Sequence, residues 1–188
     1  MGSSYYYFLA SLPLLSFDGK MPMTVGAFQE ECRRLLSEKD CALMERLWTP
    51  QDEPAPTNSG NHVLDAWLAF DRGFRNELAW LRADHLDKDP LKYLRGPRTF
   101  LSTCLEDIQR ALKMDDLLQA EEVLSKARWR FLDELGTGHY FDLESLFVYY
   151  LKLTILQRHQ EYRSSEGLNR LQEIKAMPLP QSCATAPA

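Results

Sequence analysis

Residues 142–162 read DLESLFVYYLKLTILQRHQEY, and this stretch decides the fold. Its apolar residues cover nearly the whole circumference of a helix: Leu143, Leu146, Phe147, Val148, Tyr149, Tyr150, Leu151, Leu153, Ile155 and Leu156. A helix that is apolar on all sides has to be enclosed by other elements. We therefore predict a buried central helix over about 142–162, with Phe147, Tyr150 and Leu153 in the structural core.

Charged residues interrupt this apolar stretch at Glu144, Lys152 and Arg158. An ionised group beside a core has to be paired or reach water. Lys152, which we place with the core residues, is expected either to extend its ammonium group to solvent or to pair with an acidic residue of another helix.

The rest of the chain shows apolar residues at steps of three and four, which is typical of amphipathic helices. Thr24 and Ser37 are expected to cap two of these helices at their N-termini, and Gly136 to end another as the C′ residue. The sequence shows no convincing strand, apart from an extended piece at 5–9, and it predicts an all-α bundle of about six to seven helices around the buried central helix at about 142–162. The expected helices span about 25–36, 41–48, 63–87, 91–95, 100–112, 117–135 and 168–174.

The best internal boundary is the segment 49–61, which contains Pro50, Pro54, Pro56 and Gly60 among polar residues and is expected to be a loop or hinge. It divides the chain into an N-terminal helical segment at 1–48 and a main helical bundle at 62–177. Residues 178–188, rich in Pro, Ser, Thr and Ala, are expected to be a disordered tail. We expect the two helical parts to form one compact unit.

Composition places the chain among ordinary globular proteins. It has 188 residues, of which 45% are hydrophobic and 26% charged, with a net charge of −5. The acidic balance argues against a nucleic-acid binder, which needs a basic face. No run of about 18 apolar residues is present, and residues 1–15 lack the basic start and cleavage site of a secretory signal. We therefore expect a soluble cytoplasmic protein.

The sequence contains no catalytic signature that we can assign. Gly136-Thr137-Gly138 lacks a following Gly-Lys-Ser/Thr, and the four histidines form neither HExxH nor Glu-x-x-His. There is no GxSxG, and Cys32 and Cys104 lie in apolar stripes where a thiolate is disfavoured. We predict no catalytic residue, no metal and no cofactor, and we do not expect an enzyme.

Two further groups of residues stand out. The polar group on the helix at 63–87 is expected to form a solvated face, to bind a partner or to make contacts between helices. Its members are Asp71, Arg72, Arg75, Asn76, Glu77 and Arg82, and all but Asp71 are the candidate partner-binding residues. The aromatic group gathers at 5–8 and at 140–150, and we expect it to pack the N-terminus against the central helix.

Three segments in order resemble a known family: YYYFLASLP at 5–13, FRNELAWLRA at 74–83, and HYFD at 139–142 with YYLKL at 149–153 and Arg158. They are similar to an uncharacterised bacterial family encoded among the subunits of V/A-type rotary ATPases. The late segment, with Glu166-Gly167 after it, also resembles the central-stalk adaptor of those machines, the C-type subunit of bacteria and the d-type subunit of eukaryotes. The resemblance runs from Tyr5 to about Ile174.

The resemblance implies a non-catalytic role. The central-stalk adaptor is an all-helical, funnel-shaped protein that sits on the membrane rotor ring and receives the central shaft. This chain is roughly half as long and lacks three repeated lobes, so a shortened adaptor and an assembly factor both fit. Its partners would be the shaft and rotor subunits, on the cytoplasmic side of the inner membrane. The alternatives are a free-standing helical protein-interaction module, or a small-ligand binder or enzyme with Arg72, Arg75 and Glu77 lining a pocket.

Overall fold

The computed structural model describes residues 5–48, 59–98 and 102–163, and within these ranges it contains helices and no strand. The prediction of an all-α bundle is confirmed. None of the helices in these ranges has the length and apolarity that crossing a membrane requires. The elements are α1 (Tyr6–Ser11), α2 (Val25–Leu35), α3 (Glu38–Trp48), α4 (His62–His85), the 3-10 helix η1 (Pro90–Tyr93), α5 (Ser102–Leu112), α6 (Leu117–Leu135) and α7 (Leu143–Arg163).

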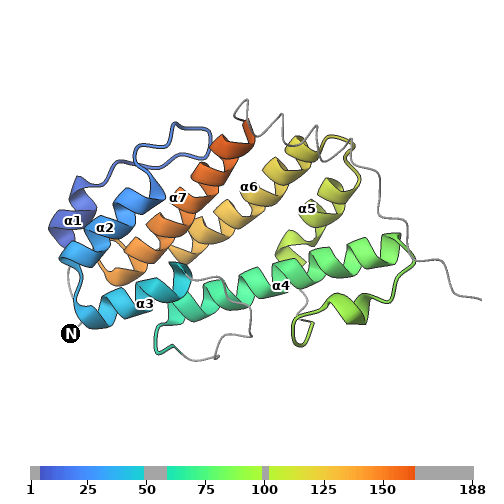
Figure 1. Cartoon of the computed structure of the whole chain (residues 1–188), viewed down its shortest axis with the longest axis horizontal. Helices are drawn as coiled ribbons and strands as arrows, with labels where there is room; N and C mark the ends of the chain where they lie inside the picture. The colour runs from blue at the N-terminus through green and yellow to red at the C-terminus, as the bar shows by residue number, and fades with distance from the viewer. Residues whose placement is uncertain (1–4, 49–58, 99–101, 164–188) are drawn as a thin grey trace, which may run out of the picture.

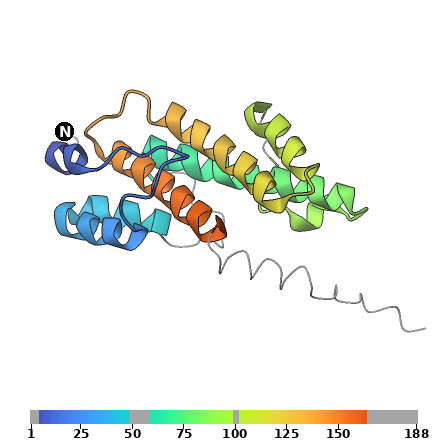
Figure 2. The ribbon, with the colours of Figure 1, turned by 90° about the horizontal axis from the view of Figure 1, so that it is seen from above.

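The long helices α6 and α7 run antiparallel, side by side, and α4 crosses them (Figure 1). The short helices α1–α3 gather at one end of the bundle, where the chain also turns from α6 into α7 (Figure 2). The opposite end holds the last turns of α4 together with η1 (Figure 1). The two ends of the molecule therefore carry different sets of residues.

Helix α7 is the buried centre that its sequence predicts, because α2, α4 and α6 all contact it. Phe147 and Leu153 are completely buried, and Tyr150 is nearly so. The buried residues of α7 point to every side of the helix: Leu143, Leu146, Phe147, Val148, Tyr150, Leu151, Leu153, Ile155 and Leu156.

Aromatic rings connect the helices around α7. The ring of Phe70 on α4 stacks on that of Phe131 on α6, with centroids 3.8 Å apart and planes nearly parallel. At the other side of the core, Phe28 on α2 stacks between Phe8 on α1 and Tyr149 on α7. Such ring pairs add about 1 kcal/mol each beyond the area that they bury.

Side-chain caps begin the helices at the expected places. Thr24 Oγ1 accepts a hydrogen bond from the N–H of Ala27, and Ser37 Oγ accepts one from the N–H of Asp40. These bonds satisfy backbone donors that have no partner inside the helix. The caps predicted at Thr24 and Ser37 are confirmed.

The structure corrects two details of local conformation. The piece at 5–9, predicted as extended, lies largely in helix α1 (Tyr6–Ser11), whose Phe8 packs against Phe28. This six-residue element is too short to show a helical period in the sequence. Gly136 adopts a right-handed conformation at the C-cap of α6, and the glycine with positive φ in this turn is Gly138. The space for a side chain at Gly136 is small, because an added Cβ would lie 3.3 Å from the carbonyl oxygen of Leu132.

Lys152, placed with the core by the sequence, lies at its edge. Its Nζ donates to Oδ1 of Asp133 on α6 at 2.6 Å, and it also lies over the ring of Trp129. Of the two expectations for this ammonium group, pairing with an acidic residue of another helix is the one that the structure contains. Asp133 is half exposed, so the pair forms at the surface.

Several sequence predictions fall on other parts of the chain. The proline-containing part of the predicted hinge at 49–58, the last predicted helix at 168–174 and the predicted tail at 178–188 lie outside the described residues. Of the hinge, residues 59–61 are described, and they lead directly into α4.

The enclosure of α7 generates a stability prediction. Leu153→Asp places a carboxylate at a completely buried position, and we expect it to cost about 4 kcal/mol or more and to abolish the cooperative melt. Gln160→Asp puts the same group on the exposed face of the same helix and should leave the melting temperature nearly unchanged. Thermal unfolding followed by circular dichroism measures both; a wild-type melt for Leu153→Asp would mean that α7 is not the core.

Candidate functional site

The polar group predicted on α4 does not form one surface. Asn76 and Glu77 are 2% and 1% exposed, whereas Arg75 and Arg82 face solvent. Arg75 pairs with Asp71 at 2.5 Å on the outside of the helix. Asn76 and Glu77 are thus buried, which fits the alternative of contacts within the protein and not a partner-binding face, and the set does not converge on a common pocket.

Asn76 and Glu77 instead hold the segment that follows η1. The Asn76 side-chain amide exchanges two hydrogen bonds with the backbone of Arg95, accepting at 2.9 Å and donating at 3.1 Å. Arg98 donates two hydrogen bonds to the carboxylate of Glu77, at 2.8 and 3.0 Å, and stacks on Trp80. A buried carboxylate needs such a bidentate partner to offset its lost hydration. The role of this pair is structural.

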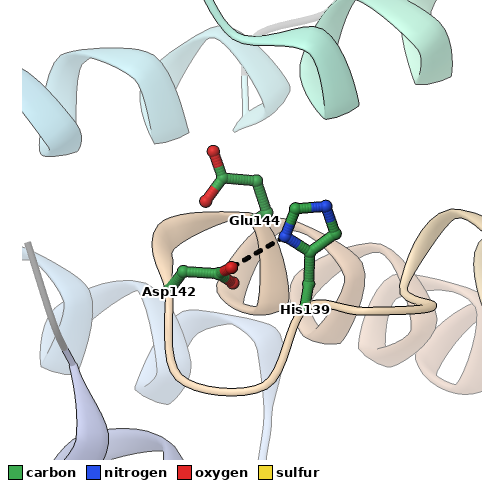
Figure 3. Close-up of side chains that lie close together, drawn as sticks. All are labelled: His139, Asp142 and Glu144. Atoms are coloured by element: carbon green, nitrogen blue, oxygen red, sulfur yellow. Dashed lines mark hydrogen bonds and ion pairs between the residues drawn. The ribbon is translucent and has the colours of Figure 1, made fainter. Parts of the chain in front are cut away.

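A second cluster, which the sequence did not single out, lies where the chain enters α7. One ligand atom each from His139, Asp142 and Glu144 can be chosen so that all three lie within 4.8 Å of one another (Figure 3). His139 and Asp142 come from the turn between α6 and α7, and Glu144 comes from the first turn of α7. Imidazole and carboxylates together can bind zinc or manganese, so the cluster has to be examined as a metal site.

Each member of this cluster already has a partner in the protein. Asp142 Oδ1 accepts hydrogen bonds from the N–H and hydroxyl of Ser145, and Oδ2 lies 2.7 Å from Nδ1 of His139. Burial acts to raise the pKa of Asp142, but the hydrogen bonds from His139 and Ser145 outweigh it, and the pKa is lowered. Glu144 Oε1 accepts a hydrogen bond from the Asn61 side chain at 2.8 Å.

The arrangement supports helix capping over metal binding. The N-terminus of a helix carries partial positive charge, which favours carboxylates and disfavours a cation. Asn61 also caps α4, because its Oδ1 accepts from the N–H of Leu64. One polar network thus joins the starts of α4 and α7.

A cavity of about 600 Å³ opens beside this network, between α3, residues 59–61 and the start of α7. Its wall carries Lys39 and Arg46 together with Asp40, Asp142 and Glu144. Because both signs of charge line it, the cavity favours no single class of charged ligand.

Exposed aromatic side chains surround the same end of the molecule. Tyr7 and Tyr140 are 88% and 73% exposed, and Tyr6 and Phe141 are about half exposed. The rings of Tyr6 and Phe141 lie 4.5 Å apart between centroids, and the N–H of Tyr5 donates to the carbonyl of Phe141. We call Tyr6, Tyr7, Tyr140 and Phe141 the aromatic end. The expectation that the aromatic residues pack into the core holds for Phe8, Phe147 and Tyr150 but not for these four.

Clustered exposed aromatic residues are typical of protein interaction surfaces, because a ring buries a large area at a small cost in conformational entropy. The sequence missed this surface because the spacing of residues 5–8 and 140–150 does not reveal which rings the fold leaves outside.

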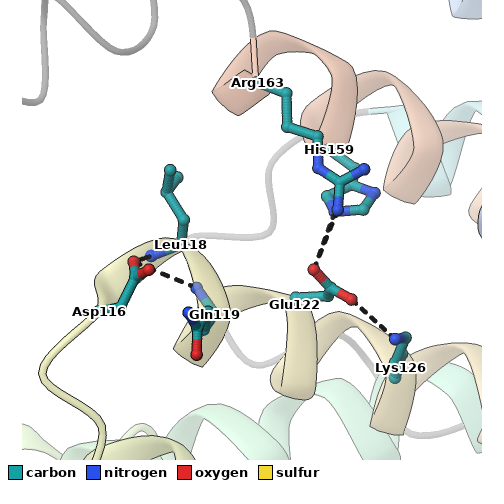
Figure 4. Close-up of polar contacts among 7 residues, drawn as sticks. All are labelled: Asp116, Leu118, Gln119, Glu122, Lys126, His159 and Arg163. Carbon is teal, nitrogen blue, oxygen red and sulfur yellow. Dashed lines mark hydrogen bonds and ion pairs between the residues drawn. The ribbon is translucent and has the colours of Figure 1, made fainter.

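A third polar cluster ties α6 to the last turns of α7 (Figure 4). Glu122 accepts hydrogen bonds from Lys126 at 2.7 Å and from Arg163 at 3.0 Å, and its pKa is lowered, chiefly by the bond from Lys126. His159 Nε2 lies 4.0 Å from the same carboxylate, and its ring contacts that of Phe17. Burial lowers the pKa of His159, and the nearby Arg163 adds to this effect.

The described cysteines are free and are not activated nucleophiles. Burial raises the pKa of Cys32 to about 12 and also raises the pKa of Cys104. The expectation that both thiols are buried is confirmed, and Cys183 lies outside the described residues.

The fold and these sites define an all-α bundle with an exposed aromatic end and a central helix held by polar caps. One protein family matches part of the chain: residues 100–177 fit the family described as "Protein of unknown function (DUF2764)". The match covers less than half of the 188 residues and includes α5, α6 and α7. Neither a curated protein nor a solved structure matches the chain.

The capping role of Asp142 is open to a direct test. Asp142→Ala should lower the free energy of unfolding by about 1–2 kcal/mol, whereas Asp142→Asn should retain most of it because Asn caps a helix almost as well as Asp. Chemical denaturation measures both changes. A metal-binding role would give another pattern, in which zinc raises the melting temperature of the wild type and both variants lose that response equally.

The burial of His159 generates a pH prediction. Its pKa is below 6.5 in the folded state, so the unfolded chain takes up a proton first as the pH falls. The contribution of this residue to stability is therefore complete above about pH 6.5 and declines below that value. His159→Gln should remove this part of the pH dependence, whereas His85→Gln, at an exposed position, should keep it; equal slopes for the wild type and His159→Gln would contradict the prediction.

Proposed function

We propose that this protein is a non-catalytic adaptor or assembly subunit of a bacterial V/A-type rotary ATPase, which links the central shaft to the membrane rotor ring. The observation that carries the proposal is the aromatic end, where the exposed ring of Tyr6 contacts those of Tyr7 and Phe141, and Tyr140 is exposed next to Phe141 in the chain. An adaptor needs such a surface for a partner polypeptide and a stiff body behind it. The enclosed helix α7 and the capping network that joins α4 to α7 provide that body.

Two of the three segments that carry the family resemblance also meet in space. YYYFLASLP contributes Tyr6 and Tyr7, and HYFD contributes Tyr140 and Phe141, so two stretches more than a hundred residues apart build the same surface. The third segment, FRNELAWLRA, contains Asn76 and Glu77, which organise the opposite end. Under the proposal, the aromatic end contacts the partner polypeptide, and the protein works on the cytoplasmic side of the inner membrane, peripheral to it through its partners.

Affinity purification of the tagged full chain from native membranes tests the proposal. The catalytic, shaft and rotor subunits of the ATPase should be recovered with the wild type. Replacing both Tyr7 and Tyr140 with Ala should reduce that recovery about tenfold or more, because exposed aromatic anchors dominate binding energy at interfaces. Tyr93→Ala removes an exposed tyrosine of η1 at the opposite end and should leave the recovery unchanged.

Two outcomes would overturn the proposal. Recovery of the chain as a monomer from intact membranes would exclude a stable place in the complex. A stoichiometric partner outside the ATPase, lost in the Tyr7 and Tyr140 variant, would identify a free-standing helical interaction module instead.

A further inference from the structure

Arg128 on α6 is a buried cation with incomplete hydrogen bonding. Its side chain is 12% exposed, and its guanidinium carbon lies 4.2 Å from the centre of the Phe74 ring on α4. Nη1 is fully shielded from solvent and makes no hydrogen bond to any residue of the ranges 5–48, 59–98 and 102–163. A buried guanidinium stays charged and normally satisfies its N–H groups, because leaving them unpaired is costly.

The carboxylates near Arg128 are too distant to satisfy it. Asp71 Oδ1 lies 3.9 Å from Nε, and Glu121 Oε1 lies 4.0 Å from Nη1. A hydrogen bond between such groups requires about 3 Å. Asp71 is also engaged elsewhere, since its Oδ2 pairs with Arg75 at 2.5 Å.

Further positive charge surrounds this group from two other helices. Burial is the largest influence lowering the pKa of Arg128; Asp71 and Glu121 oppose it, while Arg158 on α7 and Arg75 on α4 lower the pKa further. Three arginines, one each from α4, α6 and α7, therefore repel one another, and the two carboxylates offset part of this repulsion. An additional anion at this place would relieve more of their mutual repulsion.

We propose that Arg128, with Arg75 and Arg158, forms a binding site for a phosphate-class dianion. The Glu121 side chain is partly exposed and its contact with Arg128 is long, so an incoming oxyanion can displace it. With Glu121 displaced, the three guanidinium groups carry two more positive charges than the carboxylate of Asp71 balances, and this excess matches a dianion. Phosphate also offers several acceptor oxygens, which suit the fork of N–H donors on arginine.

This site is separate from the aromatic end and does not depend on the proposed function. Its arginines lie on α4 (His62–His85), α6 (Leu117–Leu135) and α7 (Leu143–Arg163), and none of them belongs to the turn between α6 and α7 that carries Tyr140 and Phe141. Phosphate binding could therefore be found whether or not the ATPase subunits are recovered, and the two experiments can fail independently.

Isothermal titration of the full chain with inorganic phosphate, at fixed ionic strength in chloride, tests the site. Phosphate should bind with one-to-one stoichiometry. Arg128→Lys and Arg158→Gln should each weaken binding about tenfold or more, because the ammonium of Lys cannot reproduce the fork and Gln removes a charge. Glu121→Gln should strengthen binding, since it removes the competing carboxylate. Arg130→Gln, an exposed arginine of α6 that pairs with Asp107, serves as the matched control and should bind like the wild type.

The results that would overturn the proposal are equally specific. They are the absence of phosphate binding to the wild type, binding that Arg128→Lys and Arg158→Gln leave intact, and binding of acetate as tight as that of phosphate. Weaker binding by Glu121→Gln would show that Glu121 is a needed partner of Arg128 and would also overturn it. Arg158 is exposed, so Arg158→Gln keeps the test decisive if Arg128→Lys does not fold.

Discussion

The enclosure of α7 constrains the whole structure, because a helix with apolar side chains on every side needs neighbours on every side. Helices α2, α4 and α6 supply them, and each brings large rings or aliphatic side chains to the contact. Two consequences follow. Polar contacts join α7 to its neighbours near both ends, where Glu144 bonds to Asn61 and His159 lies near Glu122, and at the edge of the core, where Lys152 pairs with Asp133. The short helices α1–α3 are packed against one end of the bundle, where the aromatic residues emerge (Figure 2).

Local signals in the sequence predicted most of the helices. Thr24 and Ser37 cap their helices through bonds that span three residues, and such short-range chemistry can be recognised without a structure. The polar residues of α4 could not be assigned in the same way. The partners of Asn76 and Glu77 are Arg95 and Arg98, which lie about twenty residues further on in an irregular segment where no period reports contact.

The candidate sites were less predictable than the fold for the same reason. His139, Asp142 and Glu144 match no metal-binding spacing, and they meet because the chain reverses direction between α6 and α7. The residue type alone does not distinguish buried from exposed aromatic residues, since Tyr150 is buried and Tyr140 is exposed. The burial of Arg128 could not be predicted from the sequence, because its surroundings are formed by Asp71, Phe74 and Glu121 on two helices.

Asn61 has a mechanical consequence. Its side-chain oxygen Oδ1 accepts a hydrogen bond from the N–H of Leu64 in the first turn of α4. Its side-chain nitrogen Nδ2 donates one to Glu144 in the first turn of α7. A load applied at the turn between α6 and α7 is therefore passed to α4 through a single side chain as well as through the packed core. A force that separates the two helix starts has to break the bond from Asn61 to Glu144, whereas the bond from Leu64 to Asn61 stays within the start of α4.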